Sequence, residues 1–238
     1  MKYCIPGELW NQVEVPVKDT EAVAISTYLP EIAYRLPSIT DVMMAKEFWH
    51  TVCEFAERCG AMLERTSWGV SQSERTVTID SPATFGAVQR FVGAGVDGRP
   101  VGFDRLDISA IERGYSVVFA MSSLSAGGEA VNSYVCYSVV PNINAEPDKQ
   151  VAPKWFLKRY ERLLIAGALM RICAMVDENW GDATAARLYA TTYLRELDRV
   201  THGLITSGMR KQVLLDAESV LARQSQTTNT TTNTNTVG

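Results

Sequence analysis

Residues 93–98, GAGVDG, match the G-x-G-x-x-G glycine spacing of dinucleotide-binding loops within a sequence of 238 residues. Such a loop holds a pyrophosphate only when it opens a helix, because the helix N-terminus supplies unpaired N–H groups. Here RPVG follows at 99–102, and no helical pattern begins there. We therefore expect a glycine-rich β-turn, and we keep a small-molecule or nucleotide-binding enzyme that uses loop 93–98 as the alternative function.

Two histidines and a group of serines are the next candidates for catalysis, and their surroundings argue against it. His50 and His202 lie in different helical regions with no cysteine pair nearby, a setting typical of packed or surface histidines rather than metal ligands. Ser122, Ser123 and Ser125 lack the G-x-S-x-G context of a nucleophilic serine. These residues therefore predict no catalytic set.

Acidic and thiol side chains also lack the spacing of a reactive site. Glu54, Glu57 and Glu64 can share one face of a helix, and a solvated face is the simplest interpretation. The five cysteines are odd in number and have no paired spacing, which indicates reduced and mostly buried thiols. We predict no catalytic, cofactor or metal site, and hence no enzyme.

Four cations, by contrast, gather at the start of one apolar segment: Lys154, Lys158, Arg159 and Arg162. As a nucleic-acid site this patch is weak, because Glu161 interrupts it and the neighbouring aromatic residues are candidates for the core. The rim of a protein–protein interface, which is polar and exposed, fits the patch better.

The segment that carries these cations is predicted to be a helical hairpin over residues 153–200. Pro153 suits a first helical turn, and Arg171 is the only charged residue in 163–176. Asp182 suits the N-cap of the second helix. The apolar stripe of that helix is Ala186, Tyr189, Tyr193, Leu197 and Val200. A helix that is apolar almost all round must be covered on several sides, so we interpret the hairpin as shaped to pack against sister copies.

Another helix is predicted from about residue 40 to residue 65. Ser38 and Asp41 resemble a capping box, and Trp68-Gly69 is expected to end the helix. Its buried stripe steps by three and four through Phe48, Val52, Phe55, Cys59 and Met62. A third helical pattern runs from Met209 to Leu221. We group these elements as a helical bundle domain of residues 1–70 and 150–223.

Residues 74–145 have a different pattern. Polar and apolar residues alternate in 75–80 and 104–108, while β-branched and aromatic residues fill 115–121 and 133–140. Glycines separate these runs at turn spacings, which predicts an inserted antiparallel β-sandwich or small barrel over 74–145. The fold class is thus α+β. Residues 224–238 are uncharged and rich in Thr and Asn, and we expect them to form an extended C-terminal tail.

Composition favours a soluble globular protein, with 46% hydrophobic and 21% charged residues. The apolar runs are too short for a membrane span, and the N-terminus lacks a signal peptide's apolar core, so we expect cytoplasmic synthesis and no membrane partner. The net charge of −4 is uneven: residues 152–223 hold 11 Lys+Arg and 8 Asp+Glu, which leaves 12 and 19 elsewhere. Two surfaces of opposite net charge suit a head-to-tail contact between copies better than tight nucleic-acid binding.

Several stretches resemble the head-to-tail adaptors of short-tailed bacteriophages, the connector proteins similar to tail-tube protein A. These are YLPE at 28–31, LP at 36–37, FAERC at 55–59 and the strand around ID at 79–80. The block LLIAGALMRI at 163–172 resembles that family's apolar AGAL-x-R-L helix, and Trp180 with the Ala- and Tyr-rich helix 183–193 also fits. One departure is 175–179, where the family has a proline-containing turn.

The resemblance implies a structural virion protein at the head–tail junction, made in the cytoplasm of a bacterial host. Such adaptors form rings, usually of twelve copies, that dock on the portal, extend the DNA channel and hold the tail nozzle or tube. The implied partners are sister copies, the portal, the nozzle or tube protein, and double-stranded DNA that passes without sequence-specific binding. The tail would add main-chain hydrogen bonds to the portal. The subunit and portal interface predicted on this basis is Lys154, Lys158, Arg159, Arg162, Arg187, Arg195, Arg199, Thr227, Thr228, Asn229 and Thr230.

Overall fold

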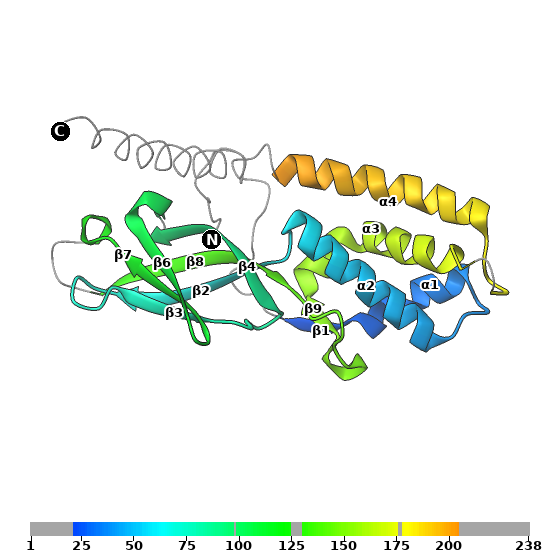
Figure 1. The fold of residues 1–238 in the computed structure, drawn as a ribbon, viewed down its shortest axis with the longest axis horizontal. Helices are drawn as coiled ribbons and strands as arrows, with labels where there is room; N and C mark the ends of the chain where they lie inside the picture. Colours follow the sequence, from blue (N-terminus) through cyan, green and yellow to red (C-terminus); the bar gives the residue numbers. More distant parts are fainter. Residues whose placement is uncertain (1–20, 98, 125–129, 176–177, 205–238) are drawn as a thin grey trace, which may run out of the picture.

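The structure is a computed structural model that describes residues 21–97, 99–124, 130–175 and 178–204. Within these residues it has four α-helices and three antiparallel sheets, none of which closes into a barrel. Figure 1 shows the helices gathered at one end of the molecule and the two larger sheets at the other. The predicted α+β class is therefore confirmed.

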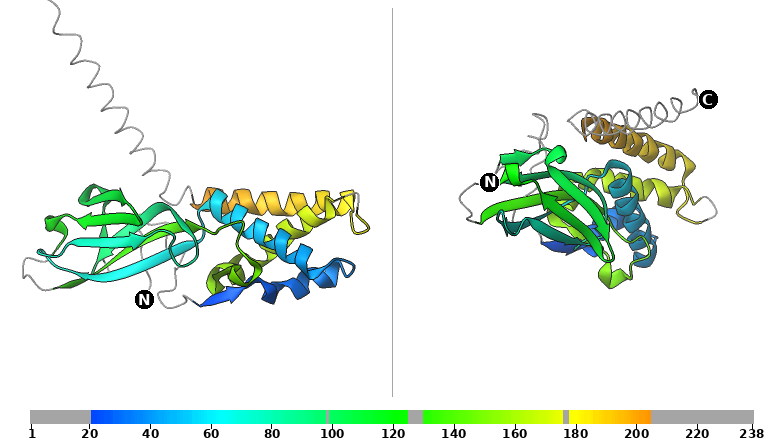
Figure 2. Two further views of the ribbon diagram at one scale, coloured as in Figure 1. Left: turned by 60° about the horizontal axis from the view of Figure 1, so that its bottom comes forward. Right: turned by 60° about the vertical axis from the view of Figure 1, so that its left-hand side comes forward.

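The helical region is built around one central helix. Its helices are α1 (Leu29–Arg35), α2 (Asp41–Cys59), α3 (Lys154–Cys173) and α4 (Ala183–Leu204). Helix α3 contacts each of the other three, and α4 and α1 lie on opposite sides of the crossing of α2 and α3 (Figure 2). Twelve of the twenty residues of α3 are buried, including all seven in 163–169.

This burial overturns one prediction. The apolar surface of α3 is covered by α1, α2 and α4 of the same chain, so it leaves no surplus for sister copies. The second helix of the hairpin forms as predicted: the Asp182 carboxylate accepts from the backbone N–H groups of Thr184 and Ala185 at 2.8 and 3.0 Å. Within its predicted stripe Tyr193 is 1% exposed and Leu197 is 7% exposed.

Helix α2 differs from its prediction at both ends. The N-cap is Thr40, whose hydroxyl accepts from the N–H of Met43 at 3.4 Å, rather than Ser38. The helix ends at Cys59 instead of residue 65, because Gly60 adopts a left-handed conformation at φ 59°. The guanidinium of Arg90 then donates to the Cys59 carbonyl at 2.8 Å, which satisfies an acceptor that the end of the helix leaves unpaired.

The strands form a two-stranded, a four-stranded and a three-stranded sheet, in the orders β1-β9, β2-β8-β4-β5 and β3-β7-β6. Their bounds are β1 Ala22–Ala24, β2 Leu63–Val70, β3 Thr76–Asp80, β4 Ala87–Val96, β5 Arg99–Val101, β6 Leu106–Ile111, β7 Gly114–Phe119, β8 Val131–Val140 and β9 Val151–Pro153. Short 3₁₀ helices occupy Ile25–Tyr28, Phe103–Arg105, Met121–Ser123 and Pro147–Lys149.

The four-stranded and three-stranded sheets touch through aromatic rings. Phe91 of β4 meets Tyr115 of β7 edge-to-face at 5.2 Å between ring centroids. Strand β3 has the predicted alternation, with Val77 and Ile79 buried between exposed neighbours. The first three residues of strand β2, 63–65, were predicted as the end of a helix, and Trp68, which was expected to end that helix, lies within the strand. The division of the chain into domains stays a prediction.

The small sheet β1-β9 ties the first described residues to the start of α3. Ala22 is opposite Pro153 in its register, and the N–H of Lys154 donates to the Glu21 carbonyl at 2.9 Å. Pro153 thus ends a strand and serves as the N-cap of α3. The predicted third helix over 209–221 and the tail over 224–238 lie outside the described residues.

Candidate functional site

The predicted cations of α3 form a row on its exposed side. Lys154, Lys158 and Arg162 are four residues apart, so they stack along one helix face, and all three side chains are exposed. Lys154 pairs with Glu21 at 2.8 Å. The exposed Arg159 lies beside this row, with its guanidinium 5.8 Å from the centre of the Tyr160 ring. The structure therefore brings together all four residues of the predicted patch.

The predicted cations of α4 lie on its solvent side. Arg195 and Arg199 are 73% and 76% exposed, and both approach the carboxylate of Glu196, at 4.0 and 2.8 Å. Arg187 is also exposed. Exposed ion pairs of this kind add little to stability, so these side chains remain available to contact another molecule. The remaining predicted interface residues, Thr227 to Thr230, lie outside the described residues.

Helix α4 also exposes two large apolar side chains on this solvent side. Leu188 is 67% exposed and Leu194 is 50% exposed. They are six residues apart, which is about 9 Å along the helix. Neither belongs to the predicted apolar stripe, and sequence periodicity assigned them no role. Single exposed leucines of this kind are common on protein surfaces, and these two form no continuous apolar patch.

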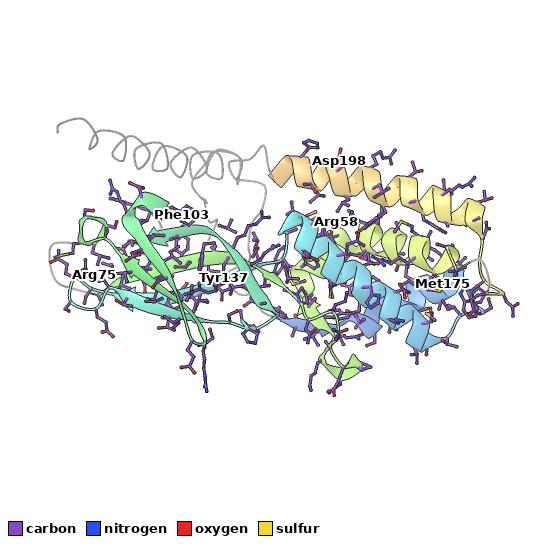
Figure 3. The ribbon with its side chains drawn as sticks, viewed as in Figure 1. Arg58, Arg75, Phe103, Tyr137, Met175 and Asp198 are labelled. Carbon is purple, nitrogen blue, oxygen red and sulfur yellow. The ribbon has the colours of Figure 1, made fainter. Side chains whose placement is uncertain are left out.

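A polar cluster joins α2 and α3 beside α4. The carboxylate of Glu54 binds both Arg171 and Arg58, the latter at 2.9 Å. The Tyr193 ring packs beside this cluster, and burial together with the charge of Glu54 raises the pKa of its hydroxyl. Figure 3 shows Arg58 at the end of α2 that lies beneath α4. Glu54 is therefore an internal partner of two arginines, so the prediction that Glu54, Glu57 and Glu64 share one solvated helix face is wrong for Glu54 and for Glu64, while Glu57 is exposed on α2.

Glu64 was missed as a structural carboxylate because it was predicted to be helical. It lies in β2 and accepts from the backbone N–H groups of Phe85 and Thr84 at 2.7 and 3.2 Å. Burial raises the pKa of this carboxyl, and the two backbone donors oppose that shift. Its acceptor role fixes the loop before β4. No sequence signal pointed to it, since the loop that it binds is some twenty residues away.

The glycine-rich run 93–98 is mainly a strand rather than a turn. Among the described residues of the run, Gly93 and Gly95 lie in β4, and Asp97, at φ 48°, belongs to the turn that leads into β5. Gly95 is a glycine because the ring of Tyr134 occupies the space that a Cβ would take. No helix follows, so the run has no helix N-terminus to hold a pyrophosphate.

A cavity of about 820 Å³ lies beside this turn. Its lining includes Asp97, Arg99, Asp104, Arg105 and Ser123. Two carboxylates and two guanidinium groups offset each other, so this lining selects neither an anion nor a cation. The cavity therefore supports no particular ligand class.

The remaining sequence candidates stay apart in the structure. His50 and His202 have their own acidic neighbours, Glu47 at 3.8 Å and Asp198 at 3.3 Å. The described residues contain no group of three metal-ligating side chains. Four of the cysteines are described, and all four are free and buried, as predicted. Ser122 and Ser123 lie in the 3₁₀ turn beside the cavity, whereas Ser125 is outside the described residues.

Comparison with known proteins adds no assignment: no protein-family model and no curated protein matches this sequence. Within the described part of the chain, no helix combines the length and the apolar character needed to cross a membrane.

Proposed function

We propose that this chain is a head-to-tail adaptor of a short-tailed bacteriophage. As a structural virion protein it would form a ring of sister copies, dock on the portal, extend the DNA channel and hold the tail nozzle or tube. In this proposal the helices form a bundle that faces neighbouring copies, and strands β2 to β8 form a β-sandwich. The support from the sequence is the resemblance of 28–31, 55–59 and 163–172 to that family.

The observation that carries the proposal is the cationic outer side of α3 and α4. Lys158 and Arg162 on α3, with Arg187, Arg195 and Arg199 on α4, point exposed positive charge outward from two adjacent helices. The chain outside residues 152–223 has an excess of seven acidic residues, 19 against 12. A heterologous contact between unlike surfaces of successive copies generates a closed ring when the rotation between copies closes on itself.

The burial of the apolar side chains of α3 determines which side chains the proposed contact between copies can use. Because the apolar interior of the helical region is filled by the chain itself, the proposed ring interface depends on polar and charged side chains. Polar interfaces with exposed rims suit subunits that fold alone and assemble afterwards. We therefore expect assembly to weaken as salt concentration rises.

Electron microscopy and mass photometry of the purified chain, alone and mixed with portal rings of short-tailed phages, test the proposal. We expect ring-shaped assemblies seated on a portal. The double variant Lys158→Glu, Arg162→Glu should lose them, whereas Arg113→Glu, an exposed cation between β6 and β7, should keep them. A chain that stays monomeric in every mixture and leaves the portals bare would contradict the proposal.

A further inference from the structure

The last turn of α2 lies at the boundary between the helical region and the larger sheets (Figure 1). Across this boundary, α2 and β8 are the two elements with the most extensive contact, which is far smaller than the contact of α3 with α4 or of β4 with β8. Parts of one chain that meet through a limited contact move relative to each other unless something further holds them. The contacts at the end of α2 therefore bear on how firmly the two regions are joined.

Two consecutive residues of β4 bind carbonyl groups of that last turn. The guanidinium of Arg90 donates to the Cys59 carbonyl at 2.8 Å, and the Nε2 of Gln89 donates to the Glu57 carbonyl at 3.1 Å. Carbonyl groups in the last turn of a helix lack the intrahelical partners that earlier ones have. The charge of Arg90 also suits the negative end of the helix dipole. Strand β4 thus holds the end of α2 through two side chains from outside the helix.

An irregularity in β4 allows both side chains to reach the helix. In a regular strand, consecutive side chains point to opposite faces of the sheet. The pairing of β4 with β8 shifts its register between Val88 and Arg90, so that Gln89 is an extra residue with no partner on β8. A bulge of this kind changes the direction of a side chain. The hydroxyl of Ser138 on β8 donates to the Oε1 of Gln89 at 3.4 Å, which leaves the amide nitrogen directed to α2.

Gly60 provides the space for this arrangement. The guanidinium of Arg90 lies where a Cβ at Gly60 would be, and Gly60 has the left-handed φ of 59° that favours glycine. The same turn is tied to α4, because the Cys59 thiol lies 3.2 Å from the Thr201 hydroxyl. The position of β4 is therefore linked to α2 and, through Cys59, to α4.

We propose that Gln89 and Arg90 of β4 form a clamp on the last turn of α2, and that this clamp fixes the orientation of the larger sheets relative to the helical region. The bulge supplies two adjacent side chains, Gly60 provides the space for one of them, and two carbonyl groups of α2 accept from them. Without the clamp, residues 60–62, where the chain passes from α2 to β2, become a hinge. This inference does not depend on the proposed adaptor function.

Pulsed electron paramagnetic resonance on the full chain tests the clamp through the distance between two spin labels. The labels are attached at Leu188→Cys on α4 and Ser109→Cys on β6, which are exposed positions, in a chain that also carries Cys4→Ser. The four described cysteines are buried and stay unlabelled in the folded protein. Dilution with unlabelled chain removes distances between copies. Arg90→Met should widen the distance distribution at least about twofold, and Arg90→Lys, which keeps the charge, should widen it less.

Arg113→Met is the matched control, because it removes an exposed arginine from the turn between β6 and β7 and should leave the distribution unchanged. A second label pair, at Lys46→Cys and Leu188→Cys, lies within the helical region and should keep its distribution in Arg90→Met. If Arg90→Met does not fold, Gln89→Met removes the other clamp bond and should widen the first distribution. An unchanged distribution in the clamp variants, an equal effect of Arg113→Met, or equal widening for the second pair would overturn the proposal.

Discussion

Gly167 of α3 lies where α2, α3 and α4 cross. Its replacement by alanine should have two opposing effects on the free energy of unfolding. An ideal Cβ at this position lies 2.5 Å from the Thr51 methyl on α2, and 2.8 and 2.9 Å from ring carbons of Tyr193 on α4. Carbon atoms make favourable contacts at about 3.5–4.0 Å. The helices must therefore move apart by about 1 Å to accept the methyl group.

The magnitude follows from two competing contributions. Alanine is favoured over glycine inside a helix by about 1 kcal/mol, whereas overpacking a filled core costs about 1–3 kcal/mol. Because Gly167 meets two rigid neighbours rather than the end of a flexible side chain, we place the cost at the upper end of that range. We expect Gly167→Ala to lower the free energy of unfolding by about 1–2 kcal/mol, and the melting temperature by about 2–8 °C.

A double-mutant cycle with Thr51→Ser tests the cause. Serine lacks the methyl group that meets the new Cβ and keeps the hydroxyl that donates to the Glu47 carbonyl at 2.8 Å. In the Thr51→Ser background, Gly167→Ala should cost less by about 0.5 kcal/mol or more, measured by thermal and urea unfolding. A rise in melting temperature for Gly167→Ala alone would refute the reasoning, because helix propensity would then outweigh the close approach of the helices.

Three further predictions concern caps, charges and thiols. Asp182→Ala removes the acceptor of two backbone N–H groups and should cost about 1 kcal/mol by urea unfolding, with Asp182→Asn close to wild type. Arg171→Met leaves the half-buried Glu54 with one arginine and should cost about 2 kcal/mol, between the values for exposed and buried pairs, whereas Arg171→Lys should cost less. Burial raises the pKa of Cys53 and of Cys136 to about 12. Between pH 9 and 12 the unfolded chain therefore loses thiol protons that the folded chain keeps, and the free energy of unfolding should fall as pH rises. At pH 8 these two thiols should react with a thiol reagent only after denaturant is added, and fast reaction in the folded protein would contradict their burial.

Several features of the fold could be predicted from local sequence because their causes are local. The stripe at 186–200 and the N-cap at Asp182 depend on neighbours within a few residues, so helix α4 forms as predicted. The alternation in 76–80 predicted β3 for the same reason. The cations of α3 and α4 could be predicted as surface residues because charged side chains are rarely buried without partners.

Long-range contacts decided the rest. The apolar periodicity of α2 continues to Met62, yet the helix ends at Cys59, where Gly60 turns left-handed and Arg90, thirty-one residues later, donates to the last carbonyl. The buried Met62 then belongs to the extended chain that leads into β2.

The run 93–98 was interpreted as a turn from its glycines, whereas Gly95 is needed in a strand because the ring of Tyr134 covers it. The sequence by itself determined which residues are apolar, charged or able to cap a helix. Only the tertiary structure decided that α3 is covered by its own chain, because that depends on the combined surfaces of α1, α2 and α4 rather than on any single segment.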